Sequence, residues 1–118
     1  MNKPSPNDAK IKLLVGKLKK LKDDRKLEKN WRGEWFSNNQ ISRLREIYET
    51  KGYEAARMFQ AGNINPRDNK FKQREDETLL KALEMINQAG LDKEISSYIL
   101  GNLNNIIDMK EESKGGLQ

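Results

Sequence analysis

A run of lysines near the start of the chain is the feature whose chemistry is simplest to name. Six lysines fall within residues 10–22, and no aspartate or glutamate interrupts them. A row of ammonium groups neutralises the phosphates of a nucleic acid and releases their condensed counterions. We therefore expect a phosphate-binding surface made of Lys10, Lys12, Lys17, Lys19 and Lys20.

The apolar residues around this run predict a basic amphipathic helix within residues 8–30. One helical stripe, outside which the five lysines lie, contains Ile11, Leu14, Val15, Leu18 and Leu21. A second interpretation stays open, because lysine also solubilises the outer face of an ordinary helix. A purely cationic face repels itself, however, and this slightly favours an anionic partner. We expect no membrane contact, since a helix lying on a membrane would need aromatic residues on this stripe.

Four further cations follow a hairpin in the middle of the chain, in the segment NINPRDNKFKQRED. The preceding stretch GYEAARMF resembles the second helix of helix-turn-helix domains in transposases and small phage packaging subunits. The resemblance implies that the next helix contacts phosphates and base edges. Its cations are Arg67, Lys70, Lys72 and Arg74. A plain helical hairpin with a polar linker explains the same pattern.

The connector NWRGEWFSNN concentrates aromatic residues around one arginine. Trp31, Trp35 and Phe36 could stack on nucleobases, as aromatics do on single strands. Packing is the stronger expectation, because a small core has much to gain from two tryptophans. We expect both tryptophans to seal the joint between the first two helices. Arg32 is expected to be exposed and to assist nucleic-acid binding.

The residues that carry most enzyme chemistry are missing. The chain has no histidine and no cysteine, so imidazole acid–base catalysis and the usual zinc sites are excluded. Glu75, Asp76 and Glu77 are consecutive, and consecutive helical side chains point in different directions. We expect no catalytic site, no metal and no cofactor.

The elements that carry these residues are all expected to be helices. The periodicity predicts an all-α, single-domain bundle of about five helices over residues 1–118, with a helix-turn-helix-like hairpin in the middle. Ser37 or Asn38 is expected to cap the second helix, and Gly52 to end it. Met58 is expected to point inward on the third helix, and Asp92 to begin a continuous fifth. Residues 37–109 would be the helical core, and residues 1–7 and 110–118 flexible ends.

Charge is divided unequally along the chain. Residues 1–33 carry eleven Lys and Arg against four Asp and Glu, whereas the other 85 residues carry twelve against fourteen. This asymmetry favours a polyanionic partner. The sequence therefore predicts a non-catalytic, cytoplasmic protein that binds DNA or RNA largely without sequence preference. A phage or mobile-element protein, or a helical subunit of a ribonucleoprotein or packaging complex, would fit.

An alternative function is a protein-interaction subunit. The fourth and fifth predicted helices bear more isoleucine and leucine than a thin bundle obviously needs. Their apolar faces would then bind a second copy of the chain or another protein.

Overall fold

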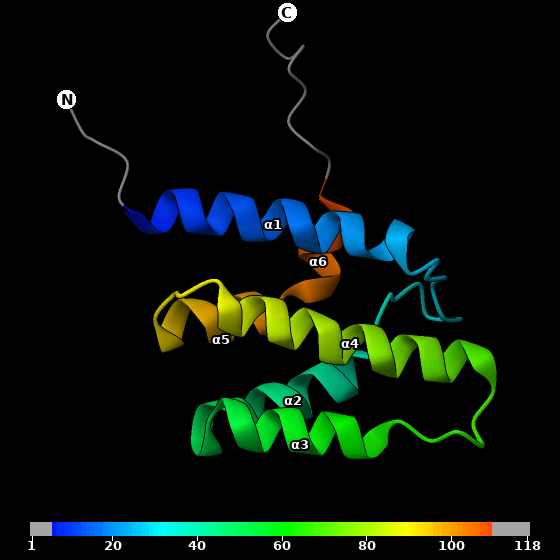
Figure 1. The fold of residues 1–118 in the computed structure, drawn as a ribbon. Coiled ribbons are helices and arrows are strands. Elements are labelled where there is room, and N and C mark those ends of the chain that lie inside the picture. The colour runs from blue at the N-terminus through cyan, green and yellow to red at the C-terminus, as the bar shows by residue number, and fades with distance from the viewer. Residues whose placement is uncertain (1–5, 110–118) are drawn as a thin grey trace, which may run out of the picture.

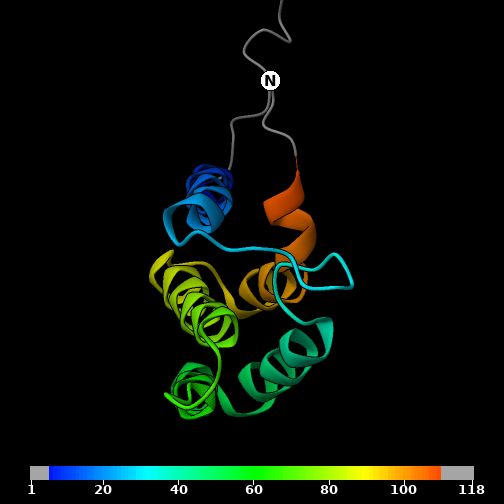
Figure 2. The same cartoon turned by 90° about the vertical axis from the view of Figure 1, so that its right-hand side faces the viewer.

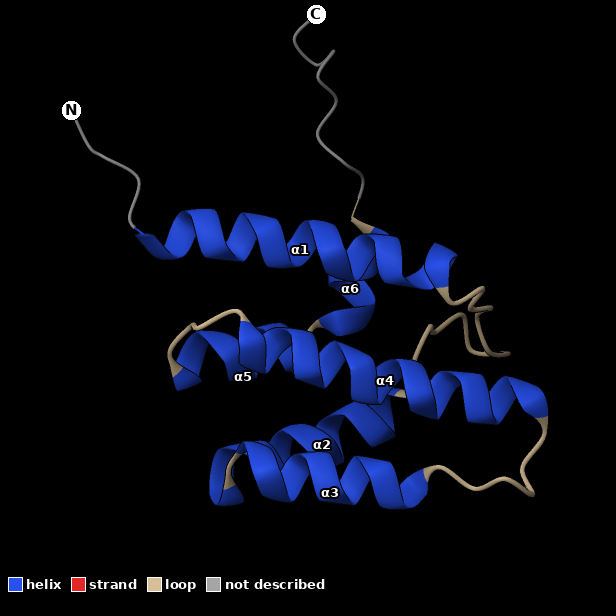
Figure 3. Ribbon diagram, in the orientation of Figure 1, coloured by secondary structure: helices blue, strands red, loops and turns tan. Residues whose placement is uncertain are grey.

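Helices make up all the regular structure in the part of the chain described by the computed structural model, residues 6–109 (Figure 3). The prediction of an all-α bundle is confirmed. The flexible ends predicted at residues 1–7 and 110–118 lie outside the described residues, except that residues 6 and 7 belong to the first helix. The helices are α1 (Pro6–Asp24), α2 (Asn38–Lys51), α3 (Tyr53–Asn63), α4 (Lys70–Gln88), α5 (Lys93–Gly101) and α6 (Leu103–Asp108).

The helices form three layers of two (Figures 1 and 2). In Figure 2, α1 and α6 make the upper layer, α4 and α5 the middle layer, and α2 and α3 the lower layer. α1 and α4 run in opposite directions, so the end of α1 lies near the start of α4 (Figure 1). None of the described helices has the length and apolar character needed to cross a membrane.

The core lies between the layers and takes its side chains from every helix. Leu14, Leu18 and Leu21 of α1 are buried, as the stripe predicts. They belong to a cluster with Phe36, Ile41, Leu44, Tyr48, Ala56, Leu79, Ala82, Leu83, Ile86, Ile99, Leu100, Leu103, Ile106 and Ile107. Each fully buried leucine, isoleucine or phenylalanine of this cluster contributes about 1.5–3 kcal/mol through removal from water.

Two predicted N-caps are confirmed. The Ser37 hydroxyl accepts a hydrogen bond from the backbone N–H of Gln40, and the Asp92 carboxylate accepts one from the backbone N–H of Ile95. Each bond satisfies a helix-terminal N–H that has no partner within the helix. Asn69 caps α4 in the same way through the backbone N–H of Lys72.

The predicted fifth helix is two helices. The break occurs at Asn102, whose backbone leaves the helical region at φ −116° and ψ 22°. Its side-chain amide donates to the carbonyl oxygen of Tyr98 at 2.8 Å. Asparagine competes for backbone groups in this way, which makes it a weak helix former. α6 then turns to cover α1.

Two details of the central hairpin differ from expectation. Met58 is exposed, although Ala56 on the same helix is buried, so the prediction for Met58 is wrong. α3 and α4 are separated by residues 64–69, whereas a helix-turn-helix joins its helices by three or four residues. The helix-turn-helix assignment stays a prediction.

Gly52 allows α3 to begin directly after α2, and replacing it is expected to destabilise the protein. Its backbone has φ 95° and ψ 178°, a region that is essentially restricted to glycine. Because an added Cβ would meet no neighbour, Gly52→Ala isolates the backbone strain. We expect the free energy of unfolding to fall by about 1–3 kcal/mol in urea titrations followed by circular dichroism.

Gly16 is the matched control for this substitution. It lies within α1, and an added Cβ there also meets nothing. Gly16→Ala is expected to raise the free energy of unfolding by about 1 kcal/mol. Equal midpoints for the two variants would contradict the assignment of strain to Gly52.

Candidate nucleic-acid interface

The five predicted lysines of α1 do not form one line. Lys10 and Lys17 border the stripe of buried leucines, and the others lie farther round the helix. Lys10 and Lys17 line a shallow groove with Met85 near the end of α4. Lys12 and Lys19 are seven residues apart and share the opposite flank, because seven residues make about two helical turns. Lys20 lies between the two flanks.

The positive charges of these lysines are little compensated by acidic side chains of the described residues. The ion pairs of the described residues involve none of the five. Among the described residues, the one hydrogen bond made by these five lysines is that of Lys10, whose ammonium donates to the carbonyl oxygen of Gly90 at 3.3 Å. A cation near the end of α4 also interacts favourably with the helix dipole. Lys12, Lys17 and Lys20 are exposed and Lys19 is half-buried, so all four can reach an external anion.

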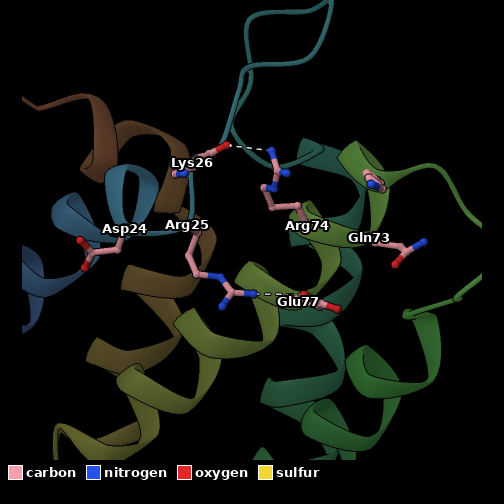
Figure 4. A pocket seen from close by; sticks show the side chains of 7 residues that line it. Asp24, Arg25, Lys26, Gln73, Arg74 and Glu77 are labelled. Atoms are coloured by element: carbon pink, nitrogen blue, oxygen red, sulfur yellow. Dashed lines mark hydrogen bonds and ion pairs between the residues drawn. The ribbon is translucent and has the colours of Figure 1, made fainter.

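A cleft lies where the end of α1 meets the start of α4 (Figure 4). We call it the basic cleft; it encloses about 390 Å³ between Asp24, Arg25, Lys26, Lys70, Gln73, Arg74 and Glu77. Four of these residues are cationic and two are anionic. Arg25 reaches across to Glu77, with Nη2 and Oε1 3.1 Å apart. The excess positive charge in a concave surface favours binding of an anion.

The end of α1 shapes this cleft. The helix stops at Asp24, earlier than the predicted boundary at residue 30, because Lys26 adopts the left-handed conformation with φ 54°. The backbone N–H of Leu27 then bonds to the carbonyl oxygen of Lys22, which closes the last turn. The carbonyl oxygen of Lys26 accepts a hydrogen bond from Arg74 at 3.2 Å (Figure 4). This bond links the two walls of the cleft.

The second predicted group of cations is divided by the structure. Lys70 and Arg74 line the basic cleft, whereas Arg67 is exposed in the loop before α4. Sequence reasoning missed Arg25 and Lys26, although only Asp23 and Asp24 separate them from the lysine run.

Lys72 does not belong with these cations. Its ammonium pairs with Asp76 at 3.0 Å and donates to the side-chain oxygen of Gln40 at 3.0 Å. Asp76 is fully buried, so Lys72 compensates a carboxylate inside the protein. α4 thus directs the Lys72 side chain toward α2, where its charge is used inside the protein, and phosphate binding by Lys72 stays a prediction.

The two tryptophans have different environments. Trp35 packs against the core, and its indole Nε1 donates to Asp108 at 2.8 Å. This bond, together with Lys29, holds the pKa of Asp108 below its ordinary value. Trp31 is 86% exposed, so the prediction that it packs between helices is wrong.

Arg32 is exposed, as expected, and lies over the ring of Trp31. Its guanidinium carbon is 4.6 Å from the ring centroid. Arginine and tryptophan attract each other in this cation–π geometry. Trp31 and Arg32 therefore form an exposed cation–π pair on the connector.

The apolar residues that suggested a protein-interaction surface on the last helices are mostly buried within the chain, so the alternative function loses this argument and stays a prediction. Leu79, Leu83 and Ile86 of α4 are buried, as are Ile99 of α5 and Leu103 of α6. The other helices cover these faces within one chain. The large apolar side chains that the described residues do expose are Leu13, Trp31, Met58, Phe71, Tyr98 and Met109.

The three consecutive carboxylates of α4 are directed to different partners. Glu75 accepts from the backbone N–H of Ser37 at 2.9 Å, Glu77 binds Arg25, and Asp76 is buried. Over residues 6–109, no group of three or more acidic side chains is arranged to hold a metal ion.

No family model, curated protein or solved structure matches this chain. The function is therefore inferred from the geometry and charge of the surfaces described above.

Proposed function

We propose that this chain is a non-catalytic nucleic-acid-binding protein that holds phosphates along α1 and in the basic cleft. The observation that carries the proposal is the cationic outer face of α1. Within the described residues, none of its lysines at positions 12, 17, 19 and 20 has a carboxylate partner. Like charges held on one helix repel each other, and a bound polyanion removes that repulsion.

The basic cleft extends this cationic surface beyond the end of α1. Arg25 and Lys26 follow α1 directly, and Lys70 and Arg74 face them from α4. α1 alone is about 28 Å long, from its 19 residues at about 1.5 Å each. Phosphates of one strand are about 3.4 Å apart along a duplex axis. The combined surface is therefore long enough to contact several consecutive phosphates.

The contacts available on α1 favour binding without sequence preference. Lysine ammonium groups act as point charges and lack the planar fork by which arginine recognises guanine. Phosphate contacts fix position on a nucleic acid but carry no direct sequence information. Affinity is then expected to depend on salt more than on base sequence.

The direct test is binding of fluorescein-labelled oligonucleotides at several salt concentrations, measured by fluorescence anisotropy. We expect log Kd to rise linearly with log salt, with a slope that counts the phosphates neutralised. Lys12→Glu together with Lys19→Glu is expected to weaken binding at least tenfold at about 100 mM salt and to reduce the slope by about 2.

A double variant with the same charge change provides the control. Lys51 and Lys93 are exposed lysines at the end of α2 and the start of α5. Lys51→Glu with Lys93→Glu is expected to weaken binding far less, because neither residue belongs to the proposed surface. Absence of binding at about 50 mM salt, or equal losses in the two double variants, would refute the proposed function.

A further inference from the structure

The turn that carries Trp31 is held by a dense set of hydrogen bonds. The Asn30 side-chain oxygen accepts from the backbone N–H groups of Arg32 at 2.9 Å and Glu34 at 3.0 Å. The Asn30 backbone N–H donates to the carbonyl oxygen of Glu34 at 2.8 Å, and Gly33, at φ 78°, closes the turn. These bonds fix the turn independently of the indole. Trp31 is nevertheless displayed almost entirely to solvent.

The body of the protein anchors this turn on its C-terminal side. The backbone N–H of Phe36 donates to the Asn104 side chain at 2.9 Å, and the Asn104 amide donates back to the carbonyl of Phe36 at 2.7 Å. Trp35 adds its bond to Asp108. Hydrogen bonds thus hold the turn internally and attach it to the body of the protein, and the turn bears one exposed aromatic side chain.

A second exposed aromatic side chain lies close to this turn. A groove of about 390 Å³ separates Leu27–Asn30 from the start of α4, and Phe71 lines its far wall. Phe71 is 61% exposed. The near wall ends at Asn30, so Trp31 follows it by one residue, or about 3.8 Å between Cα atoms. Phe71 therefore lines the groove itself, and Trp31 is on the residue that directly follows its near wall.

The same groove is joined to the basic cleft. Arg74 lines both cavities, and its bond to the carbonyl of Lys26 marks the boundary between them. Cationic side chains thus line the cleft on one side of Arg74, and the exposed Phe71 lines the groove on the other. Proteins that bind single strands combine these two features, with phosphates on cations and bases stacked on aromatic rings.

We infer that Trp31 and Phe71 are stacking platforms for unpaired nucleobases, so that the ligand is a single-stranded nucleic acid. The inference rests on the proposed function and specifies its ligand. Arg32 lies over one face of the Trp31 ring. The rest of the exposed indole surface is open to a base. Bases inside a duplex already stack on their neighbours, so their faces are closed to these rings. Arg74 and Lys70 would hold the phosphates beside the stacked bases.

The experiment compares Trp31→Ala and Phe71→Ala with wild type on three probes of equal phosphate number. These are a mixed-sequence single strand, a single strand whose central residues are abasic, and a duplex. Each variant is expected to bind the intact single strand about 5- to 150-fold more weakly. Neither should change duplex binding, and neither should change the salt slope, because no phosphate contact is lost. On the abasic strand the variants and wild type should bind equally.

Fluorescence gives a second readout of the same contact. Titration with the intact strand is expected to quench the tryptophan emission of wild type and to leave that of Trp31→Ala unchanged. Tyr98→Ala is the control, because Tyr98 is a 62% exposed aromatic residue on α5, outside the groove. It should bind all three probes as wild type does.

The outcomes separate the inference from the proposed function. If both variants bind the intact strand like wild type while binding stays salt-dependent, the stacking inference is overturned and the phosphate surface survives. Equal losses on the duplex or on the abasic strand also overturn it. If no probe binds at low salt, the proposed function fails, and a protein partner for the Trp31 turn becomes the better explanation.

Discussion

Replacing Phe36 with alanine is expected to lower the free energy of unfolding by about 3–5 kcal/mol. Phe36 is fully buried and belongs to the central cluster. Its removal leaves a cavity as well as losing the transfer free energy of the ring. A domain of this size is stable by about 5–15 kcal/mol in total, so the variant would lose a large fraction of its stability.

Phe71→Ala removes the same side chain from the surface and is the control for this prediction. Phe71 is exposed, so its replacement is expected to change the free energy of unfolding by about 0.5 kcal/mol or less. Urea denaturation followed by circular dichroism measures both variants. A small loss for Phe36→Ala would mean that Phe36 does not pack in the central cluster. Near-wild-type stability of Phe71→Ala would also show that any loss of binding by that variant is not due to unfolding.

The fold class could be predicted from the sequence because the signals that mark helices and their ends are local. The leucine stripe of α1, the caps at Ser37 and Asp92, and the turn at Gly52 each depend on a few neighbouring residues. The helix ends at Lys26 and Asn102 were not predictable in this way. A helix end is usually signalled by glycine at the left-handed position, and Lys26 gives no such signal. Asn102 ends its helix through a side-chain bond to the carbonyl oxygen of Tyr98, which the sequence alone does not show.

The candidate site was only partly predictable, because it depends on contacts between distant segments. Lysines on α1 were found from their spacing alone. Arg25 and Lys26 face Lys70 and Arg74 across one cleft because α1 and α4 are antiparallel, and the sequence alone does not show this arrangement. Trp31 and Trp35 are four residues apart and look alike in sequence. Their different exposure follows from the Asn30 turn and from Asp108, which is 73 residues from Trp35.

Lys72→Met is expected to lower the free energy of unfolding by about 2–3 kcal/mol, since it leaves the buried Asp76 carboxylate without its cation. Asp76 Oδ1 binds Lys72 and Gln40, while Oδ2 has no hydrogen-bond partner among the described residues. Lys72 is partly exposed, which places the expected loss below that of a completely buried pair. Arg57→Met removes a surface pair with Glu54 and is expected to leave the urea midpoint unchanged.

The reason for the loss can be tested by removing both charges. Lys72→Met with Asp76→Leu eliminates the buried carboxylate together with its partner, and replacing a buried pair by apolar residues is often neutral. Gln60 keeps its bond in this variant, because it donates to the backbone carbonyl of Asp76 at 2.9 Å. We expect the double variant to recover to within about 1 kcal/mol of wild type. A double variant as unstable as Lys72→Met would show that the loss comes from packing and not from an uncompensated charge.

Lys72 and Lys70 differ by two positions on α4, and they lie in different environments: Lys72 pairs with the buried Asp76, whereas Lys70 lines the basic cleft. Lys72→Met is expected to reduce stability and to leave the salt slope of oligonucleotide binding unchanged, because its charge is used inside the protein. Lys70→Met is expected to leave stability unchanged and to reduce the slope by about 1, since Lys70 lines the basic cleft. Measured together, these variants distinguish a charge that stabilises the fold from one that binds phosphate. The reverse result would place the nucleic-acid surface on the α2 side of α4.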